Sequence, residues 1–550
     1  MLLRKTLLAS VSVIGFAIAA PAMAQTVLNP QQATGTLDQS GTQTITTTAT
    51  GLNALAAGNQ FNSNGINLLG NGTTALSVSS NFTFGQVIGS IDPVATPSTT
   101  TLTQSALNTI SATGSTANGT AALIGGGQSA LNSANSATFA LLADATGTLQ
   151  QAINTDLTAA SSFTATNTIG ADGPSGQASI LGNGFGQVAN TSLNSAAFLG
   201  AGAATIGLDQ KAPTGTVNAT QTNIAAASVA NAGNPVIDPS ITNLSQTAGF
   251  SLNTVAGQGA TTLTLTNGGS DVGQNASFAT GSTIESANSQ TALTGAAATP
   301  SNGLVQISGA SQSNGLTLNT VSNTGATTFG DLAAGFTQAV DLSNVTLSAP
   351  IGVTYGAGTN TVATASSANL LVASTGAGNA SVAGSSSALT QANSVNLNNV
   401  SSGGLVSGTL AQSTTGAVAP ASLANTALAL TGVGSATLTN VSQSQGQSLN
   451  TLSGAGAASL DAQQTADSVT LGANNVQTAQ TALGVATIGG GLQGASSSVN
   501  VATLGSFGAG SLLQTANAVS QTNGNSLTAN GGAAIAGGSQ SVTNTINQIK

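Results

Sequence analysis

The stretch SQSNGLTLNTV at residues 311–321 recurs twice more in the chain with few changes. SQTAGFSLNTV occupies residues 245–255, and SQSQGQSLNTL occupies residues 442–452. All three copies fit the pattern S-Q-[ST]-x-G-x-[ST]-L-N-T-[VL]. Chance matches in a chain rich in Ser, Thr, Asn and Gln do not explain agreement over this length, so the sequence predicts an internal repeat.

Weaker copies keep only a Gln, an apolar residue six positions later and an Asn seven positions later. They are Gln60 with Asn67, Gln128 with Asn135, Gln187 with Asn194, and Gln391 with Asn398. A last copy starts at Gln521 and has Thr528 in place of the Asn. Successive Gln residues are 52 to 79 positions apart, about 66 on average. Variable spacing around a fixed motif is typical of a solenoid, because loops can leave each coil without disturbing the stacked strands.

The predicted fold is all-β, a parallel β-solenoid built from degenerate repeats of about 66 residues. Alternating runs such as TLTLT at residues 262–266 favour short strands. Gln and Asn side chains at one place in every coil would stack as ladders, in which each amide bonds the amides above and below it. The candidate structural ladder residues are Gln246, Asn253, Gln312, Asn319, Gln391, Asn398, Gln443, Asn450 and Gln521.

Three finer expectations follow from the same pattern. Coils of about 20–25 residues would give about three coils per repeat and a rod on the order of 100–120 Å long. Residues 141–160 are the least strand-like stretch, and a short helix fits best there. Asn323 follows the strand-like run of the second strong copy and is expected in an exposed turn.

The chain divides into four predicted segments. Residues 1–24 resemble a secretory signal peptide, because Arg4 and Lys5 precede an apolar run that ends in Ala-Met-Ala. Residues 25–58 form an N-terminal segment that is disordered or capping, residues 59–532 form the repeat solenoid, and residues 533–550 form a C-terminal tail. We therefore expect an exported protein, extracellular or at the cell surface in association with the outer membrane.

Composition argues against most kinds of chemistry. The chain has no Cys and no His, so it has no thiolate or imidazole for nucleophilic catalysis or a transition-metal site. Without residues 1–24, Lys211 and Lys550 are the only cations, which is too few for nucleic-acid binding. The acids are scattered, and calcium-loop spacings do not occur. We expect no catalytic, metal-binding or cofactor-binding residues and no cofactor, so the protein is predicted not to be an enzyme.

The spacing of Gln, Gly and Asn, with the acidic, cysteine-free and small-residue composition, resembles bacterial secreted or surface adhesins and biofilm-matrix proteins that have β-solenoid repeats. The resemblance to curlin-type fibre subunits is weaker, since curlin repeats are much shorter. The resemblance implies a structural or adhesive surface protein, or an extracellular matrix or fibre component. Two alternatives stay open: a surface-layer lattice subunit, and a polysaccharide-binding or polysaccharide-cleaving β-helix.

The composition of the C-terminal part of the repeats predicts that the chain associates with other molecules. The last acid is Asp467, and Lys550 is the only charged residue after it. Residues 501–532 are rich in Gly, Ala, Asn and Gln and contain no Pro, a composition that favours cross-β stacking. We expect the chain to associate with itself, end to end or as fibres, or with other cell-surface and matrix components. We expect no transmembrane span once the signal segment is removed.

Overall fold

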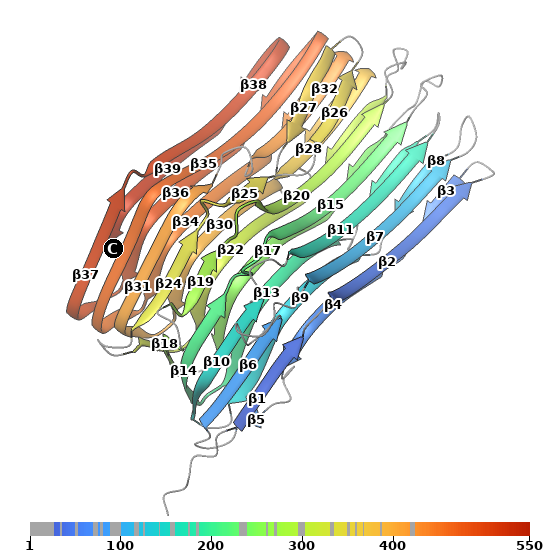
Figure 1. Ribbon diagram of the computed structural model, residues 1–550. Helices are drawn as coiled ribbons and strands as arrows, with labels where there is room; N and C mark the ends of the chain where they lie inside the picture. Colours follow the sequence, from blue (N-terminus) through green and yellow to red (C-terminus); the bar gives the residue numbers. More distant parts are fainter. Residues whose placement is uncertain are drawn as a thin grey trace, which may run out of the picture.

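The structure is a stack of β-strands that follow one another in sequence order from the blue to the red end of Figure 1. This computed structural model describes residues 27–33, 36–49, 53–69, 75–76, 81–88, 101–114, 120–124, 127–141, 144–153, 160–173, 177–182, 186–229, 239–259, 262–268, 272–294, 303–330, 335–348, 352–357, 360–366, 368–384, 388–418 and 424–550. All regular secondary structure within these residues is β-strand. The predicted signal peptide, residues 1–24, lies outside them.

The strands form two large parallel sheets that close each coil. Sheet 1 consists of β4 (Gln60–Leu69), β5 (Ala75–Leu76), β9 (Gln128–Leu141), β13 (Gly186–Gly200), β17 (Ser245–Gln258), β22 (Ser311–Asn323), β30 (Leu389–Ser402), β34 (Val441–Gly454), β36 (Leu492–Leu504) and β39 (Ser539–Ile549). Each of its long strands pairs in parallel with the corresponding strand of the next coil, for example β17 with β22. The parallel solenoid predicted from the repeat is therefore confirmed.

Sheet 2 contains the remaining strands of each coil. It consists of β1 (Val27–Ala33), β2 (Thr36–Ala49), β3 (Asn53–Ala56), β6 (Asn81–Ile88), β7 (Thr101–Gly114), β8 (Thr120–Ile124), β10 (Ala145–Ile153), β11 (Ser161–Gly173), β12 (Ala178–Leu181), β14 (Ala203–Lys211), β15 (Val217–Val229), β16 (Ser240–Thr242), β18 (Thr262–Asn267), β19 (Gln274–Ser277), β20 (Ser282–Thr294), β21 (Leu304–Ser308), β23 (Thr327–Phe329), β24 (Phe336–Asp341), β25 (Val345–Ser348), β28 (Asn369–Ala377), β29 (Asn379–Ala383), β31 (Leu405–Val418), β32 (Asn425–Val433), β33 (Ala436–Thr439), β35 (Gly456–Gly489), β37 (Phe507–Asn517) and β38 (Ser520–Ala536).

One repeat makes one coil, which corrects the expected coil size. The chain runs through β13 in sheet 1, then through β14, β15 and β16 in sheet 2, and returns to sheet 1 as β17 beside β13. Equivalent Gln residues of adjacent coils are 47 to 79 positions apart. Because each coil uses a whole repeat, the expected coils of about 20–25 residues are wrong. Nine stacked long strands of sheet 1 span only about 40 Å at about 4.8 Å per step, so the molecule is shorter and wider than the expected rod.

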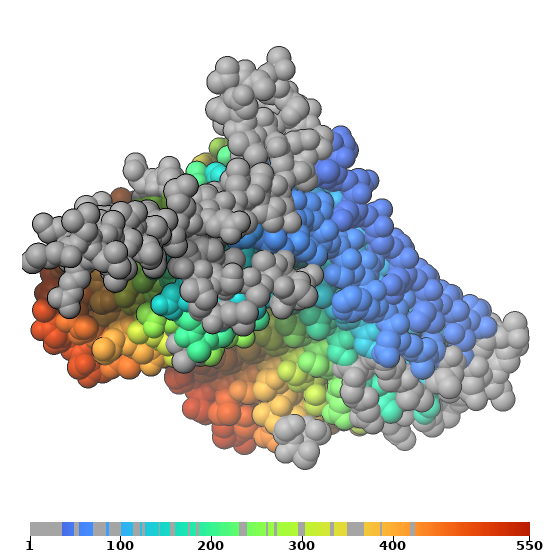
Figure 2. Space-filling model, turned by 90° about the horizontal axis from the view of Figure 1, so that it is seen from below, coloured from blue at the N-terminus to red at the C-terminus, as the bar shows by residue number. Residues whose placement is uncertain are grey.

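Two local features depart from a uniform coil. Within residues 141–160, the stretch expected to hold a short helix, residues 145–153 form β10, whose Leu149 and Ile153 are buried, and residues 142–143 and 154–159 lie outside the described residues. An antiparallel pair, β26 (Gly352–Ala357) and β27 (Asn360–Ser366), is inserted between β25 and β28. The insertion lengthens one coil without breaking the register on either side, because β20 still pairs with β28. In Figure 2 the sequence colours also follow one another across the molecule, as stacked coils require.

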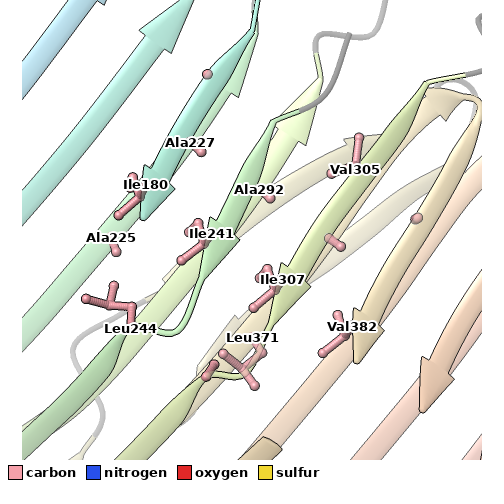
Figure 3. Close-up of a cluster of buried hydrophobic side chains, with 14 of the residues drawn as sticks. Ile180, Ala225, Ala227, Ile241, Leu244, Ala292, Val305, Ile307, Leu371 and Val382 are labelled. Carbon is pink, nitrogen blue, oxygen red and sulfur yellow. The ribbon is translucent and has the colours of Figure 1, made fainter. Parts of the chain in front are cut away.

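Alternating side chains fill the inside of the coils. In β17 and β22 every second residue up to the Leu of the motif is buried, while the Ser and Thr residues between them are more exposed. Because equivalent residues stack in register, the buried side chains form three apolar columns that run along the stack. The first column contains Ile180, Ile241, Ile307 and Val382 (Figure 3). The second contains Leu193, Leu252 and Leu318, and the third contains Phe139, Phe198 and Val255.

Candidate functional site: four amide ladders

A continuous ladder of glutamines runs along sheet 1. Each Gln Nε2 donates to the Oε1 of the Gln in the preceding coil, at 2.7–2.9 Å. The nine members are Gln60, Gln128, Gln187, Gln246, Gln312, Gln391, Gln443, Gln493 and Gln540. All except Gln540 are buried. Each Gln inside this ladder therefore has a Gln partner above and below it.

A second ladder, of asparagines, runs along sheet 1 seven residues further on. Each Asn Nδ2 donates to the Oδ1 of the Asn in the following coil, at 2.8–3.0 Å. Its members are Asn67, Asn135, Asn194, Asn253, Asn319, Asn398, Asn450, Asn500 and Asn547. All nine have a φ of 51° to 58°, the left-handed region in which Asn is enriched.

The left-handed backbone explains why an Asn stands at this position. Elsewhere along β17 successive side chains alternate between the two faces, but Leu252 and Asn253 are both buried. The positive φ of Asn253 breaks the alternation, so the apolar residue and the amide both point into the coil. An L-residue without a short polar side chain would hold this conformation at a cost of about 1–2 kcal/mol. Local geometry and side-chain bonding thus both select Asn.

Two further ladders lie on sheet 2, facing those of sheet 1. One contains Asn108, Asn167, Asn223, Asn288, Asn369, Asn425, Asn475 and Asn525, joined at 2.8–3.0 Å. The other contains Gln86, Gln151, Gln210, Gln274, Gln338, Gln412, Gln464 and Gln514, joined at 2.6–2.9 Å. Our sequence analysis missed both, although the Gln series repeats at intervals similar to those of the motif Gln.

Facing ladders join the two sheets as two amide seams. In seam 1, Gln246 Nε2 donates to the backbone O of Ser289 in sheet 2 at 2.9 Å, and Asn288 Nδ2 donates to the backbone O of Ser313 in sheet 1 at 2.7 Å. Seam 1 comprises the Gln ladder of sheet 1 and the Asn ladder of sheet 2. It separates the first apolar column from the second, since Ile169 and Phe163 lie on opposite sides of Asn167.

Seam 2 has the reverse composition, with the Asn ladder on sheet 1 and the Gln ladder on sheet 2. Asn253 Nδ2 donates to the backbone O of Asn275 at 2.9 Å, and Gln274 Nε2 donates to the backbone O of Asn253 at 2.8 Å. Seam 2 separates the second apolar column from the third. Each buried amide thus bonds its own ladder and the opposite sheet. Removing one leaves its buried partners without a hydrogen bond, which lowers the stability by about 1–3 kcal/mol.

Eight of the nine predicted ladder residues lie in these ladders. The structure brings Gln246, Gln312, Gln391 and Gln443 into one ladder, and Asn253, Asn319, Asn398 and Asn450 into the other. Gln521 is a correction, because it lies on β38 and its Nε2 donates to the backbone O of Ser497 and Thr545. Gln493 with Asn500 and Gln540 with Asn547 hold the last two motif positions, and they keep the Gln-to-Asn spacing of seven.

Asn323 is a second correction. It is not in an exposed turn but is 4% exposed at the end of β22. Its Nδ2 donates to the backbone O of Ala326 at 2.8 Å and to Thr327 Oγ1 at 3.3 Å. The chain therefore folds back within three residues, and the Asn side chain closes that bend from inside.

Ionisable groups are few, and one oppositely charged pair flanks Gln210 of seam 2. Lys211 Nζ is 3.1 Å from Asp209 Oδ2. Burial of Asp341 raises its pKa, but hydrogen bonds from the Ser343 N–H, the Ser343 hydroxyl and the Thr415 hydroxyl lower the pKa by more than burial raises it. The net pKa of Asp341 therefore lies below its usual range. No group of three or more acids lies close enough to hold a metal ion within the described ranges. The same part of the chain contains no helix that could span a membrane.

The outer face of sheet 1 carries a shallow polar groove of about 300 Å³. Its lining residues include Gly249, Gly315, Asn190, Thr247 and Ser313. It contains hydroxyl and amide groups but no charged side chain. Such a surface can donate and accept hydrogen bonds but offers no acidic or basic side chain.

Comparison of the chain with models of protein families, with curated proteins and with solved structures found no match.

Proposed function

We propose that this chain is an exported structural protein that serves adhesion at the cell surface, or an extracellular matrix or fibre, without catalysis. The observation that supports the proposal is the continuity of the four amide ladders along the stack. They place the chain's recurrent polar side chains inside the coils, where they hold coil to coil and sheet to sheet. Such an arrangement favours a rigid repeated scaffold rather than a single reactive centre.

The surface composition supports the same proposal. Between the buried positions of sheet 1, the outward side chains are mainly Ser, Thr and Gly, as in β22 and β34. A broad uncharged face that repeats every coil suits many weak contacts spread along a surface, which add by multivalency. The signal-like residues 1–24 supply the route out of the cell that such a role requires.

The proposal is tested by location and by loss of attachment. Intact cells that express the chain should lose it on treatment with external protease, and cells from which its gene is deleted should attach to surfaces less or form a weaker matrix. Re-expression of the unchanged chain should restore attachment. A chain with Asn253→Ala and Asn319→Ala should restore it poorly, while the matched variant Ser322→Ala at an exposed position should restore it fully.

A chain that is inaccessible to external protease would overturn the proposal. So would a deletion strain that attaches and builds matrix as the parent does. If the purified chain instead cleaves a polysaccharide, the enzymatic alternative replaces the structural one.

A further inference from the structure

The two ends of the stack are the places where the ladders stop. At the N-terminal end, β1, β2 and β3 pair with β6, β7 and β8, and no other described strand lies on their opposite edges. At the C-terminal end, β37 and β38 pair with β35, and β39 pairs with β36, again with no described strand beyond them. Both ends therefore present parallel strand edges, which can accept a further strand.

The ladder positions of the two ends match. Gln43 pairs in register with Asn108, at the position of the Asn series of sheet 2 that ends at Asn525. Its Nε2 donates to the backbone O of Phe61 and Asn108 Oδ1 has no partner, so the bonded ladder itself begins at Asn108. Gln31 pairs with Gln86 and stands in the Gln series that ends at Gln514. On sheet 1 the Gln ladder begins at Gln60 and ends at Gln540. Each ladder position thus holds an amide residue at both ends of the stack.

The directions of the ladders match only one orientation. Every Gln Nε2 donates toward the N-terminal end, so the Gln ladder of sheet 1 finishes in the Nε2 of Gln60 at that end and in the Oε1 of Gln540 at the other. Every Asn Nδ2 donates toward the C-terminal end. On sheet 1, a copy stacked head to tail therefore places a donor on an acceptor in both ladders, whereas a head-to-head contact places like groups together.

The apolar columns also continue across such a junction. If Asn525 of one copy lies beside Gln43 of the next, the same register places Leu527 on Ile45 and Val519 on Leu37. Ile45 and Leu527 both pack against the first column, and Leu37 and Val519 both pack against the second. On sheet 1, Ile546 is 43% exposed and would meet Ile66, which packs against the second column.

We propose that the C-terminal end of one copy binds the N-terminal end of a second copy of this chain, in parallel register, so that the two ladders of sheet 1 run through the junction and the strands of sheet 2 continue in register. Gln521 then gains a role, because this register sets it beside Gln39, which already accepts from Gln104 Nε2. The C-terminal strands from β36 to β39 contain no charged side chain, so no like-charge repulsion opposes the contact. The inference rests on the proposed structural function and names its partner and geometry.

The absence of Cys makes the register directly testable. Thr44 and Ser526 are exposed and would be neighbours across the junction, at about the 4.8 Å separation of adjacent strands that a disulfide can span. In the purified full chain, Thr44→Cys combined with Ser526→Cys should give a series of covalent multimers on mild oxidation. Ser40→Cys combined with Ser526→Cys places the thiols about 13 Å off register and should stay monomeric on a denaturing gel.

A second measurement separates stacking from general stickiness. Sedimentation velocity of the full chain should show polymers that grow with concentration. Ile546→Lys at the C-terminal end should weaken association at least tenfold, while Val433→Lys, at a similarly exposed apolar residue on β32 within the stack, should not.

Three outcomes would overturn the inference. The full chain could stay monomeric at all concentrations, the two cysteine pairs could crosslink equally, or Ile546→Lys and Val433→Lys could weaken association equally. A monomeric chain that external protease removes from cells and that cells still need for attachment would leave the proposed function standing. If the chain forms polymers but never reaches the cell surface, the stacking inference stands and the proposed function falls.

Discussion

Removing one rung of the Asn ladder is the sharpest test of how the coils hold together. Asn319 Nδ2 donates to Asn398 Oδ1 at 3.0 Å and to the backbone O of Ala339 at 2.7 Å, and its own Oδ1 accepts from Asn253 at 2.9 Å. Asn319→Ala leaves these buried groups unsatisfied, at about 1–3 kcal/mol. It also puts Ala at a φ of 55°, which costs about 1–2 kcal/mol more. We expect a loss of about 2–5 kcal/mol.

Native-state hydrogen exchange is the assay, because a whole-chain melting temperature dilutes a local effect in so long a chain. In a stack of nearest neighbours the change should be confined to β22 and to the coils beside it. A loss of at least 2 kcal/mol corresponds to about 30-fold faster exchange there. Asn319→Gly should recover about 1 kcal/mol, since Gly adopts positive φ freely.

Ser322→Ala, at an exposed position three residues further on, is the matched control and should change exchange by less than about 0.5 kcal/mol. If Asn319→Ala exchanges no faster than Ser322→Ala, the ladder does not hold the coils together and the reasoning is refuted.

Three further outcomes follow from the structure. Gln493→Ala should lower the stability of the C-terminal coils by about 1–3 kcal/mol and Gln521→Ala by less than about 1, because only Gln493 joins a buried ladder; equal losses in hydrogen exchange would contradict this. Far-UV circular dichroism should show a β spectrum that reductant leaves unchanged, and a helical spectrum would refute the fold. The lowered folded pKa of Asp341 means that its carboxylate stabilises the fold above about pH 4 and that this stability is lost as the pH falls through the folded value. Asp341→Asn should therefore flatten the pH dependence of exchange in β24 below pH 4, and an unchanged profile would show that the carboxylate is not responsible.

The motif predicted the fold because two properties of its Gln and Asn residues indicate the stacked strands: their spacing, and the backbone conformation that the Asn adopts. Their seven-residue spacing marks a strand that crosses two ladders, and Asn253, Asn319 and Asn450 combine a buried amide with a left-handed φ that few residues tolerate. This double requirement keeps the motif visible where its other positions vary. Gln493 and Asn500 satisfy the same rule although Val501 stands where the strong copies have Thr, and a search by spacing alone would have found them.

The coil size could not be predicted from the motif, since the repeat period does not state how many turns it contains. Gln151, Gln210 and Gln274 recur at intervals of 59 and 64, close to those of the motif Gln, but a residue that occurs once per repeat has this period whatever the number of coils. The segments that join sheet 1 to sheet 2 vary in length, so the sequence does not show directly which Gln residues face each other across a coil. Asn323 was misplaced for a related reason, because its bond to the backbone O of Ala326 forms only once the chain has turned.

The large coil has a mechanical consequence. Tension between the two ends of the stack loads the hydrogen bonds of successive coils in series, so the coils detach one at a time. Each detached coil of 47 to 79 residues frees about 160–280 Å of extended chain at about 3.5 Å per residue. No disulfide limits that extension, because the chain lacks Cys. A compact stack about 40 Å tall would thus lengthen in steps several times its own height and absorb work at each one.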